Sequence, residues 1–133
     1  MKALLLDTDV AVDFLRGRAE AVAFVNSQAA RIALSVITVA ELYAGAKGQE
    51  EELALGEFIQ LFPIFPVTPE IARSAGLHER NFDRGHGLGL ADALIAATAD
   101  SHDAELKTLN VRHYPMFERL KPAYVRAPNR RPA

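Results

Sequence analysis

Four oxygen-bearing side chains stand at positions where they could act together on a phosphate ester. They lie at or near the junctions between predicted strands and helices: Asp7, Glu41, Asp92 and Asn110. Asp7 directly follows an apolar run, and Asp92 lies in the first turn of a helix that is otherwise almost entirely apolar. In α/β proteins the carboxyl ends of parallel strands meet at one edge of the sheet, where ligands bind. We therefore expect an acidic site at that edge.

Such an acidic cluster needs a cation. Two carboxylates about 4 Å apart repel by roughly 4 kcal/mol at an effective dielectric constant near 20, so three ionised acids would not stay together unaided. The chain has no cysteine, and oxygen ligands alone suit Mg²⁺ or Mn²⁺ better than zinc. Such a cation activates water and neutralises charge on a phosphoryl group, so phosphodiester hydrolysis is the expected chemistry.

Three of these four side chains also have a purely structural explanation. Asp92 would interact favourably with the amino end of its own helix. Glu41 would complete a capping box with Thr38 if a helix spans residues 38–47. Asn110 would be an ordinary turn residue.

Two further acids follow Asp7 at short spacing. Asp9 either joins the site or caps the first helix through an Asx turn. Asp13 comes one helical turn later, and we expect it to face solvent. Both remain secondary candidates.

Length, composition and charge limit the class of protein. The chain has 133 residues, half of them apolar, which favours one folded domain over 1–133. A net charge of -2 argues against a general nucleic-acid coat. No apolar run approaches the roughly 20 residues of a membrane span, and we expect a soluble, cytoplasmic protein. The basic residues 126–133 are expected to form a flexible tail, or alternatively an edge that contacts phosphates.

Apolar segments alternate with helical patterns along the chain, which predicts an α/β fold with a mostly parallel sheet. Strands are expected over residues 3–6, 31–35, 64–67, 106–109 and 124–125. Helices are expected over residues 10–15, 19–26, 38–47, 50–61, from 68 onward, 90–99 and 111–117.

Four motifs in this order make the chain resemble a PIN domain, and specifically the VapC-type ribonuclease toxins of bacterial toxin-antitoxin systems. They cover almost the whole chain: Leu5-Leu6-Asp7-Thr8-Asp9-Val10, Ser35-Val36-Ile37-Thr38-Val39-Ala40-Glu41-Leu42, Leu90-Ala91-Asp92-Ala93-Leu94-Ile95-Ala96-Ala97 and Thr108-Leu109-Asn110-Val111-Arg112-His113-Tyr114.

The resemblance implies a three-layer α/β/α fold with a mostly parallel central sheet. It implies that Asp7, Glu41 and Asp92 hold Mg²⁺ or Mn²⁺, with Asp7 and Asp92 as direct ligands. Asn110 matches a fourth catalytic position, which is another Asp in many members of the family.

The same resemblance implies a metal-dependent endoribonuclease that inhibits translation or growth when it is not neutralised. A metal-bound water would attack an RNA phosphate in line and leave a 5′ phosphate on one product. Arg112, Thr8 and Asp9 are the candidates for RNA contact. A small antitoxin protein and a second copy of the chain are the expected partners.

Other readings of the same residues remain open. A haloacid-dehalogenase-like phosphotransferase also begins with a strand that ends in Asp-x-Asp, and Asp7 would then be the nucleophile. A receiver domain would need a phosphate-accepting Asp after a central strand, and this class is nearly excluded because the sequence has no Asp between Asp13 and Asp83. A catalytically inactive binding module is the third alternative.

Overall fold

A four-stranded parallel sheet forms the centre of the protein. The computed structural model describes residues 1–82 and 88–127. The strands are β1 (Leu4–Leu6), β2 (Ile32–Ser35), β3 (Ile64–Phe65) and β4 (Glu105–Lys107). Their order in the sheet is β3-β2-β1-β4, and every neighbouring pair is parallel. The predicted parallel sheet is therefore confirmed.

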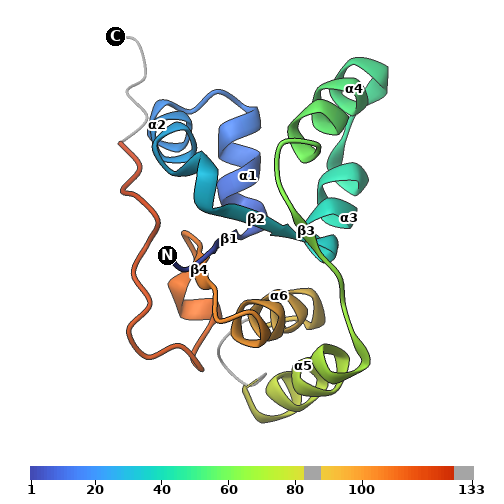
Figure 1. The fold of residues 1–133 in the computed structure, drawn as a ribbon, viewed down its shortest axis with the longest axis vertical. Coiled ribbons are helices and arrows are strands. Elements are labelled where there is room, and N and C mark those ends of the chain that lie inside the picture. Colours follow the sequence, from blue (N-terminus) through green and yellow to red (C-terminus); the bar gives the residue numbers. More distant parts are fainter. Residues whose placement is uncertain (83–87, 128–133) are drawn as a thin grey trace, which may run out of the picture.

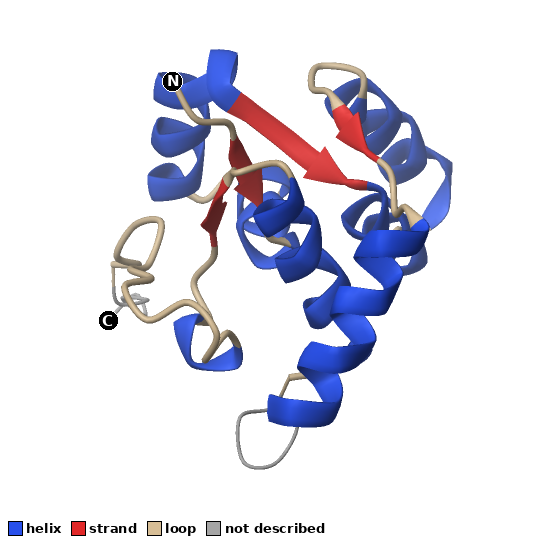
Figure 2. Ribbon diagram, turned by 60° about the horizontal axis from the view of Figure 1, so that its bottom comes forward, coloured by secondary structure: helices blue, strands red, loops and turns tan. Residues whose placement is uncertain are grey.

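Helices cover both faces of this sheet (Figure 1). The first group comprises α1 (Thr8–Leu15), α2 (Ala19–Gln28), α3 (Val36–Gly45) and α4 (Gly48–Ile59). The second group comprises α5 (Pro69–Phe82) and α6 (Leu90–Ser101), which pack against each other below the sheet in Figure 1. Two short 3₁₀ turns, η1 (Ala29–Arg31) and η2 (Val111–His113), precede β2 and follow β4. Figure 2 shows the strands between these helices. The three-layer α/β/α prediction is confirmed.

Alternation along the strands divides the core into two clusters. Successive side chains of a strand point to opposite faces. Leu5 therefore packs with residues of α5 and α6, such as Ile71 and Ala96, whereas Leu4 and Leu6 belong to the cluster of α1, α2 and α4. Because β1 is buried on both faces, its sequence is a continuous apolar run.

The ends of several elements differ from the sequence-based expectation. Helix α3 begins at Val36, because the Ser35 hydroxyl accepts a hydrogen bond from the Ile37 N–H at 3.0 Å and caps the helix. The predicted capping box of Thr38 and Glu41 is therefore wrong. Thr38 is instead fully buried in the first turn.

Two elements predicted near the carboxyl terminus are also wrong. The helix expected over 111–117 is only the η2 turn, and residues 124–125 form no strand. Tyr124 instead makes side-chain contacts with α1 and α2. Within residues 1–82 and 88–127, no helix is long and apolar enough to cross a membrane.

Candidate active site

Asp7 is held rigidly where the carboxyl ends of β1 and β4 meet. Its backbone N–H donates to Lys107 O at 2.8 Å, and its side chain caps α1 by accepting the Thr8 N–H at 2.8 Å. The other carboxylate oxygen, Oδ2, accepts hydroxyl groups from Thr108 at 2.8 Å and Tyr114 at 2.7 Å. Only 5% of the residue is exposed. Three donors, from Thr8, Thr108 and Tyr114, thus fix this carboxylate.

Burial makes the negative charge of Asp7 costly. Burial, together with the smaller effect of the nearby charge of Asp9, raises the pKa of Asp7 to about 6, even though hydrogen bonds from Tyr114, Thr108 and Thr8 oppose the shift. Removing a carboxylate from water disfavours its ionised form. A cation beside Asp7 would offset this cost.

Asp92 approaches Asp7 from the opposite layer, in the first turn of α6. The Tyr114 hydroxyl oxygen lies 2.7 Å from Asp7 Oδ2 and 3.3 Å from Asp92 Oδ1. On its other oxygen, Asp92 lies 3.6 Å from His113 Nδ1. One phenol group therefore stands between the two carboxylates that were expected to be direct metal ligands.

Glu41 is an exposed residue of α3. Its Oε1 accepts the Thr8 hydroxyl at 2.6 Å, and that hydroxyl oxygen lies 3.3 Å from Thr38 Oγ1. Thr8 follows Asp7 in the chain, so Glu41 reaches the site through an intervening side chain. In the part of the chain that the structure describes, no three His, Cys, Asp or Glu side chains form a group that could hold a metal ion. The three predicted acids are thus neighbours, but not all in direct contact.

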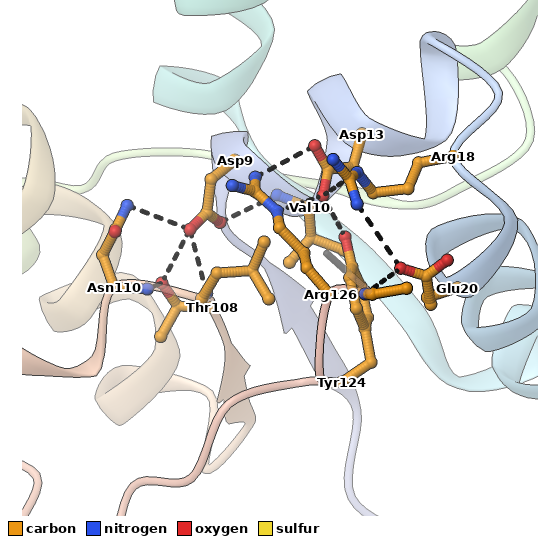
Figure 3. A network of polar contacts seen from close by, with 11 residues as sticks. Asp9, Val10, Asp13, Arg18, Glu20, Thr108, Asn110, Tyr124 and Arg126 are labelled. Atoms are coloured by element: carbon orange, nitrogen blue, oxygen red, sulfur yellow. Dashed lines mark hydrogen bonds and ion pairs between the residues drawn. The ribbon is translucent and has the colours of Figure 1, made fainter. Parts of the chain in front are cut away.

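Asp9 binds the segment that follows β4 (Figure 3). Its Oδ2 accepts the Leu109 N–H at 2.9 Å and the Asn110 side-chain amide at 3.1 Å, and it lies 3.3 Å from Thr108 Oγ1. Burial raises the pKa of Asp9, and the hydrogen bonds from Leu109, Val10 and Thr108 oppose that shift. Asn110 is thus next to the acidic site, but its amide is directed to Asp9.

The candidate RNA contacts differ in what they can offer a ligand. The side chains of Thr8 and Asp9 are engaged in the intramolecular hydrogen bonds described above. Arg112 is exposed on η2, directly before the residues that contact Asp92 and Asp7.

Asp13 is the centre of a separate polar network, and the expectation that it faces solvent is wrong. It is only 6% exposed. Its carboxylate accepts the Tyr124 hydroxyl at 2.7 Å and two guanidinium hydrogen bonds from Arg126 at 2.9 and 3.0 Å. Arg18 Nε lies 3.7 Å away (Figure 3).

This network attaches the carboxyl-terminal segment to α1 and α2. The Ala127 N–H donates to Glu20 at 2.9 Å, and the Phe24 and Tyr124 rings lie 6.1 Å apart. Burial alone would raise the pKa of Asp13, but the hydrogen bonds and charges of its partners lower it overall. Arg126, the first residue of the predicted tail, is thus bound to Asp13, while residues 128–133 of that tail lie outside the described residues.

The donor chemistry of the main site fits a divalent cation. Asp7, Asp92 and Glu41 offer carboxylate oxygens and no sulfur, which suits a hard ion with oxygen ligands. Within the described ranges, Asp7 Oδ1 accepts only the Thr8 N–H, which leaves a lone pair of that oxygen available. Asp7 and Asp92 therefore offer negative charge and a free acceptor to a metal ion, while Thr8 separates Glu41 from this pair.

Tyr114 is the residue that the sequence interpretation missed. In the sequence Tyr114 is only the last position of a motif, although a buried tyrosine hydroxyl normally needs a hydrogen-bond partner. That requirement was the available signal in the sequence. The sequence could not show that the partners would be the two acids of the site.

Comparisons with known proteins agree with this geometry. A family model described as PIN domain matches residues 4–117. Ribonuclease VapC10 of Mycobacterium tuberculosis is 42% identical over 132 residues, covering 97% of this chain and 98% of VapC10. Ribonuclease VapC19 of the same organism is 42% identical over 124 residues, covering 90% and 98%.

A solved structure shows the same fold. A toxin-antitoxin complex from Klebsiella pneumoniae contains a chain with a TM-score of 0.79 and 29% sequence identity. The match covers 92% of this chain and 98% of that chain. The family model, the VapC relatives and this structure agree, and the chain therefore belongs to the PIN domain family.

Proposed function

We propose that this protein is a metal-dependent endoribonuclease and the toxin of a toxin-antitoxin pair. The observation that carries the proposal is the approach of Asp7 and Asp92 to one shared hydroxyl group at the carboxyl edge of the sheet. PIN membership and the high similarity to named ribonucleases supply the reaction class. Membership of this family removes the support for a haloacid-dehalogenase-like phosphotransferase with Asp7 as nucleophile.

We assign Mg²⁺ or Mn²⁺ to the oxygen ligands Asp7 and Asp92, with Glu41 completing the acidic site. When bound, the ion supplies an activated water for in-line attack on phosphorus and stabilises charge on the leaving 3′ oxygen. The protein contributes fixed carboxylates: Asp7 is held by three hydrogen bonds, and Glu41 is oriented by Thr8.

The remaining residues of the site have supporting roles in this proposal. Arg112 is exposed beside the acids and offers a guanidinium to an RNA phosphate. Asp9 holds Thr108 and Asn110 in place, and Thr8 holds Glu41. We therefore assign Thr8, Asp9 and Asn110 to the architecture of the site, and Arg112 to substrate contact.

The expected partners are cellular RNA, a small antitoxin protein and a second copy of the chain. The Klebsiella structure is titled a toxin-antitoxin complex, which supports a protein that neutralises the enzyme. We expect the reaction to take place in the cytoplasm, where such an RNA substrate is found. Coexpression with the cognate antitoxin should restore growth that the enzyme alone arrests.

Cleavage of RNA by purified protein tests the proposed function. Wild type, Asp7→Asn and Asp92→Asn are compared in Mg²⁺, in Mn²⁺ and in EDTA. We expect wild-type cleavage only with a divalent ion, and at least a roughly 100-fold loss in both variants, because each loses a charged ligand. Asp100→Asn is the matched control, since this acid lies on α6 but is exposed. Undiminished cleavage by both site variants would contradict the assignment.

Sequencing of new RNA 5′ ends after brief expression in cells would identify the target. The Asp7→Asn variant is the control for ends produced by other nucleases. Ends that carry a 5′ phosphate and depend on Asp7 are the expected result.

A further inference from the structure

Tyr114 combines a buried ring with a hydroxyl group placed inside the acidic site. The residue is 1% exposed and belongs to the core cluster between the sheet and helices α5 and α6. Its ring lies 6.4 Å from that of Phe117. Because the core packing fixes the ring, the position of the hydroxyl oxygen is fixed as well.

The hydroxyl group lies between two parts of the chain whose separation must stay constant for the two carboxylates to keep their distance. It lies 2.7 Å from Asp7, at the end of β1, and 3.3 Å from Asp92, in the first turn of α6. These two elements belong to different layers of the fold. Any change in their separation would change the distance between the two carboxylates.

The single hydroxyl proton limits what Tyr114 can do. A phenol has one proton to donate, and the shorter distance identifies Asp7 Oδ2 as its acceptor. Together with Thr108 this bond fills Oδ2 and leaves the free lone pair on Oδ1. The phenol oxygen then faces Asp92 Oδ1 with its own lone pairs. Asp7 alone satisfies the hydrogen-bond donor of this buried hydroxyl, so satisfying the donor does not explain why a second carboxylate lies beside it.

We propose that Tyr114 is a positioning residue, whose hydroxyl sets the orientation of Asp7 and its distance from Asp92 so that both bind the same divalent cation. The inference rests on the proposed function, since it assumes that these acids are the metal ligands. Groups that hydrogen-bond to metal ligands typically change metal affinity by about 10- to 100-fold when removed. A similar loss is expected for Tyr114→Phe.

Direct Mn²⁺ binding is the decisive measurement. The paramagnetic resonance signal of free Mn²⁺ is followed while metal is titrated into the purified, RNA-free protein. Tyr114→Phe keeps the buried ring and removes only the hydroxyl group. We expect its Mn²⁺ dissociation constant to rise about 10- to 100-fold, and RNA cleavage to require correspondingly more metal, with a smaller loss of rate at saturating Mn²⁺.

Tyr124→Phe is the matched control. Its hydroxyl also donates to a buried carboxylate at 2.7 Å, but that carboxylate is Asp13, outside the acidic site. This variant should bind Mn²⁺ as wild type does. Replacing Tyr114 with 4-aminophenylalanine restores a donor at the same ring position, and its affinity should return toward the wild-type value even if Tyr114→Phe does not fold.

Asp7→Asn separates failure of this inference from failure of the proposed function. If wild type and Asp7→Asn bind Mn²⁺ equally, the metal site itself is misassigned. If Asp7→Asn loses binding while Tyr114→Phe keeps wild-type affinity or binds more tightly, the positioning role is overturned and the site stands. Failure of 4-aminophenylalanine to recover affinity would also overturn the role of the donor.

Discussion

The hydroxyl group of Thr8 donates to Glu41 Oε1 at 2.6 Å and thereby joins the first turn of α1 to α3. Thr8 directly follows Asp7, so the same short segment carries one acid of the site and orients another. Glu41 itself is exposed. An exposed glutamate has several side-chain rotamers, and this contact selects among them.

Removing the Thr8 hydroxyl should therefore impair cleavage without unfolding the protein. Thr8→Val keeps the shape of the side chain but leaves Glu41 without its donor, and we expect roughly 10-fold slower RNA cleavage. Thr8→Ser keeps the hydroxyl group and should retain most of the activity. Initial cleavage rates at saturating Mn²⁺ measure the effect, and equal rates for the two variants would contradict it.

A negative charge at Asn110 should mildly destabilise the metal-free protein. Its side-chain amide donates to Asp9 Oδ2 at 3.1 Å, so Asn110→Asp would place one carboxylate against another. Asn110 is exposed and solvent weakens the repulsion. We expect Asn110→Asp to lower the free energy of unfolding in EDTA by about 1 kcal/mol more than Asn110→Ala does. Urea unfolding of both variants tests this, and the reverse order would refute the repulsion.

The stability of the metal-free protein should fall as pH rises through the titration of Asp7. Its pKa is about 6 in the folded protein against an ordinary value of 3.8. Between these values the folded state binds more protons than the unfolded state, so the free energy of unfolding decreases with rising pH. The shift of about two units corresponds to a loss of about 3 kcal/mol. Above pH 6 the full cost of the buried charge is present.

The comparison with Asp7→Asn isolates this contribution. In EDTA, wild type should lose about 1–3 kcal/mol of stability relative to the variant between pH 4 and about pH 7. Chemical unfolding at several pH values measures the difference. A difference that stays constant over this range would show that Asp7 does not titrate as its burial requires.

The placement of Asp7 and Asp92 near one another was predictable because both conflict with their local sequence. Asp7 and Asp92 interrupt apolar segments, and a buried charge without partners is too costly to be accidental. The alternation of strands and helices likewise predicted the parallel sheet. Both inferences depend on patterns among residues that are close in the sequence, and the folded protein contains the strands and helices that these patterns predict.

The partners of these residues were not predictable, because they come from distant segments. Asp13 looks like a surface residue of a short helix, yet its hydrogen-bond partners Tyr124 and Arg126 lie more than 100 positions later. The capping box failed for a related reason: Ser35 caps α3 first, and Thr38 then points toward Thr8. Tertiary contacts decided each case.

The Asp13 network should contribute measurably to stability. Asp13 is buried and paired, and Asp13→Asn removes its charge and replaces one acceptor oxygen with an amide NH₂ that faces the donors of Arg126 and Tyr124. Breaking a buried charge-assisted network is costly, but the Arg126 side chain is 48% exposed and solvent reduces the effect. We expect Asp13→Asn to lower the free energy of unfolding by about 1–3 kcal/mol.

The pH dependence of this effect has the opposite sign to that of Asp7. The lowered pKa of Asp13 means that its contribution is present above the ordinary pKa of an Asp and is lost as pH falls through the folded value. Wild type and Asp13→Asn should therefore converge in stability under acidic conditions. Asp100→Asn, at an exposed position, is the control and should change stability little. Equal unfolding curves for Asp13→Asn and this control at pH 7 would show that the network is dispensable, and that Arg126 and Tyr124 do not anchor the carboxyl-terminal segment.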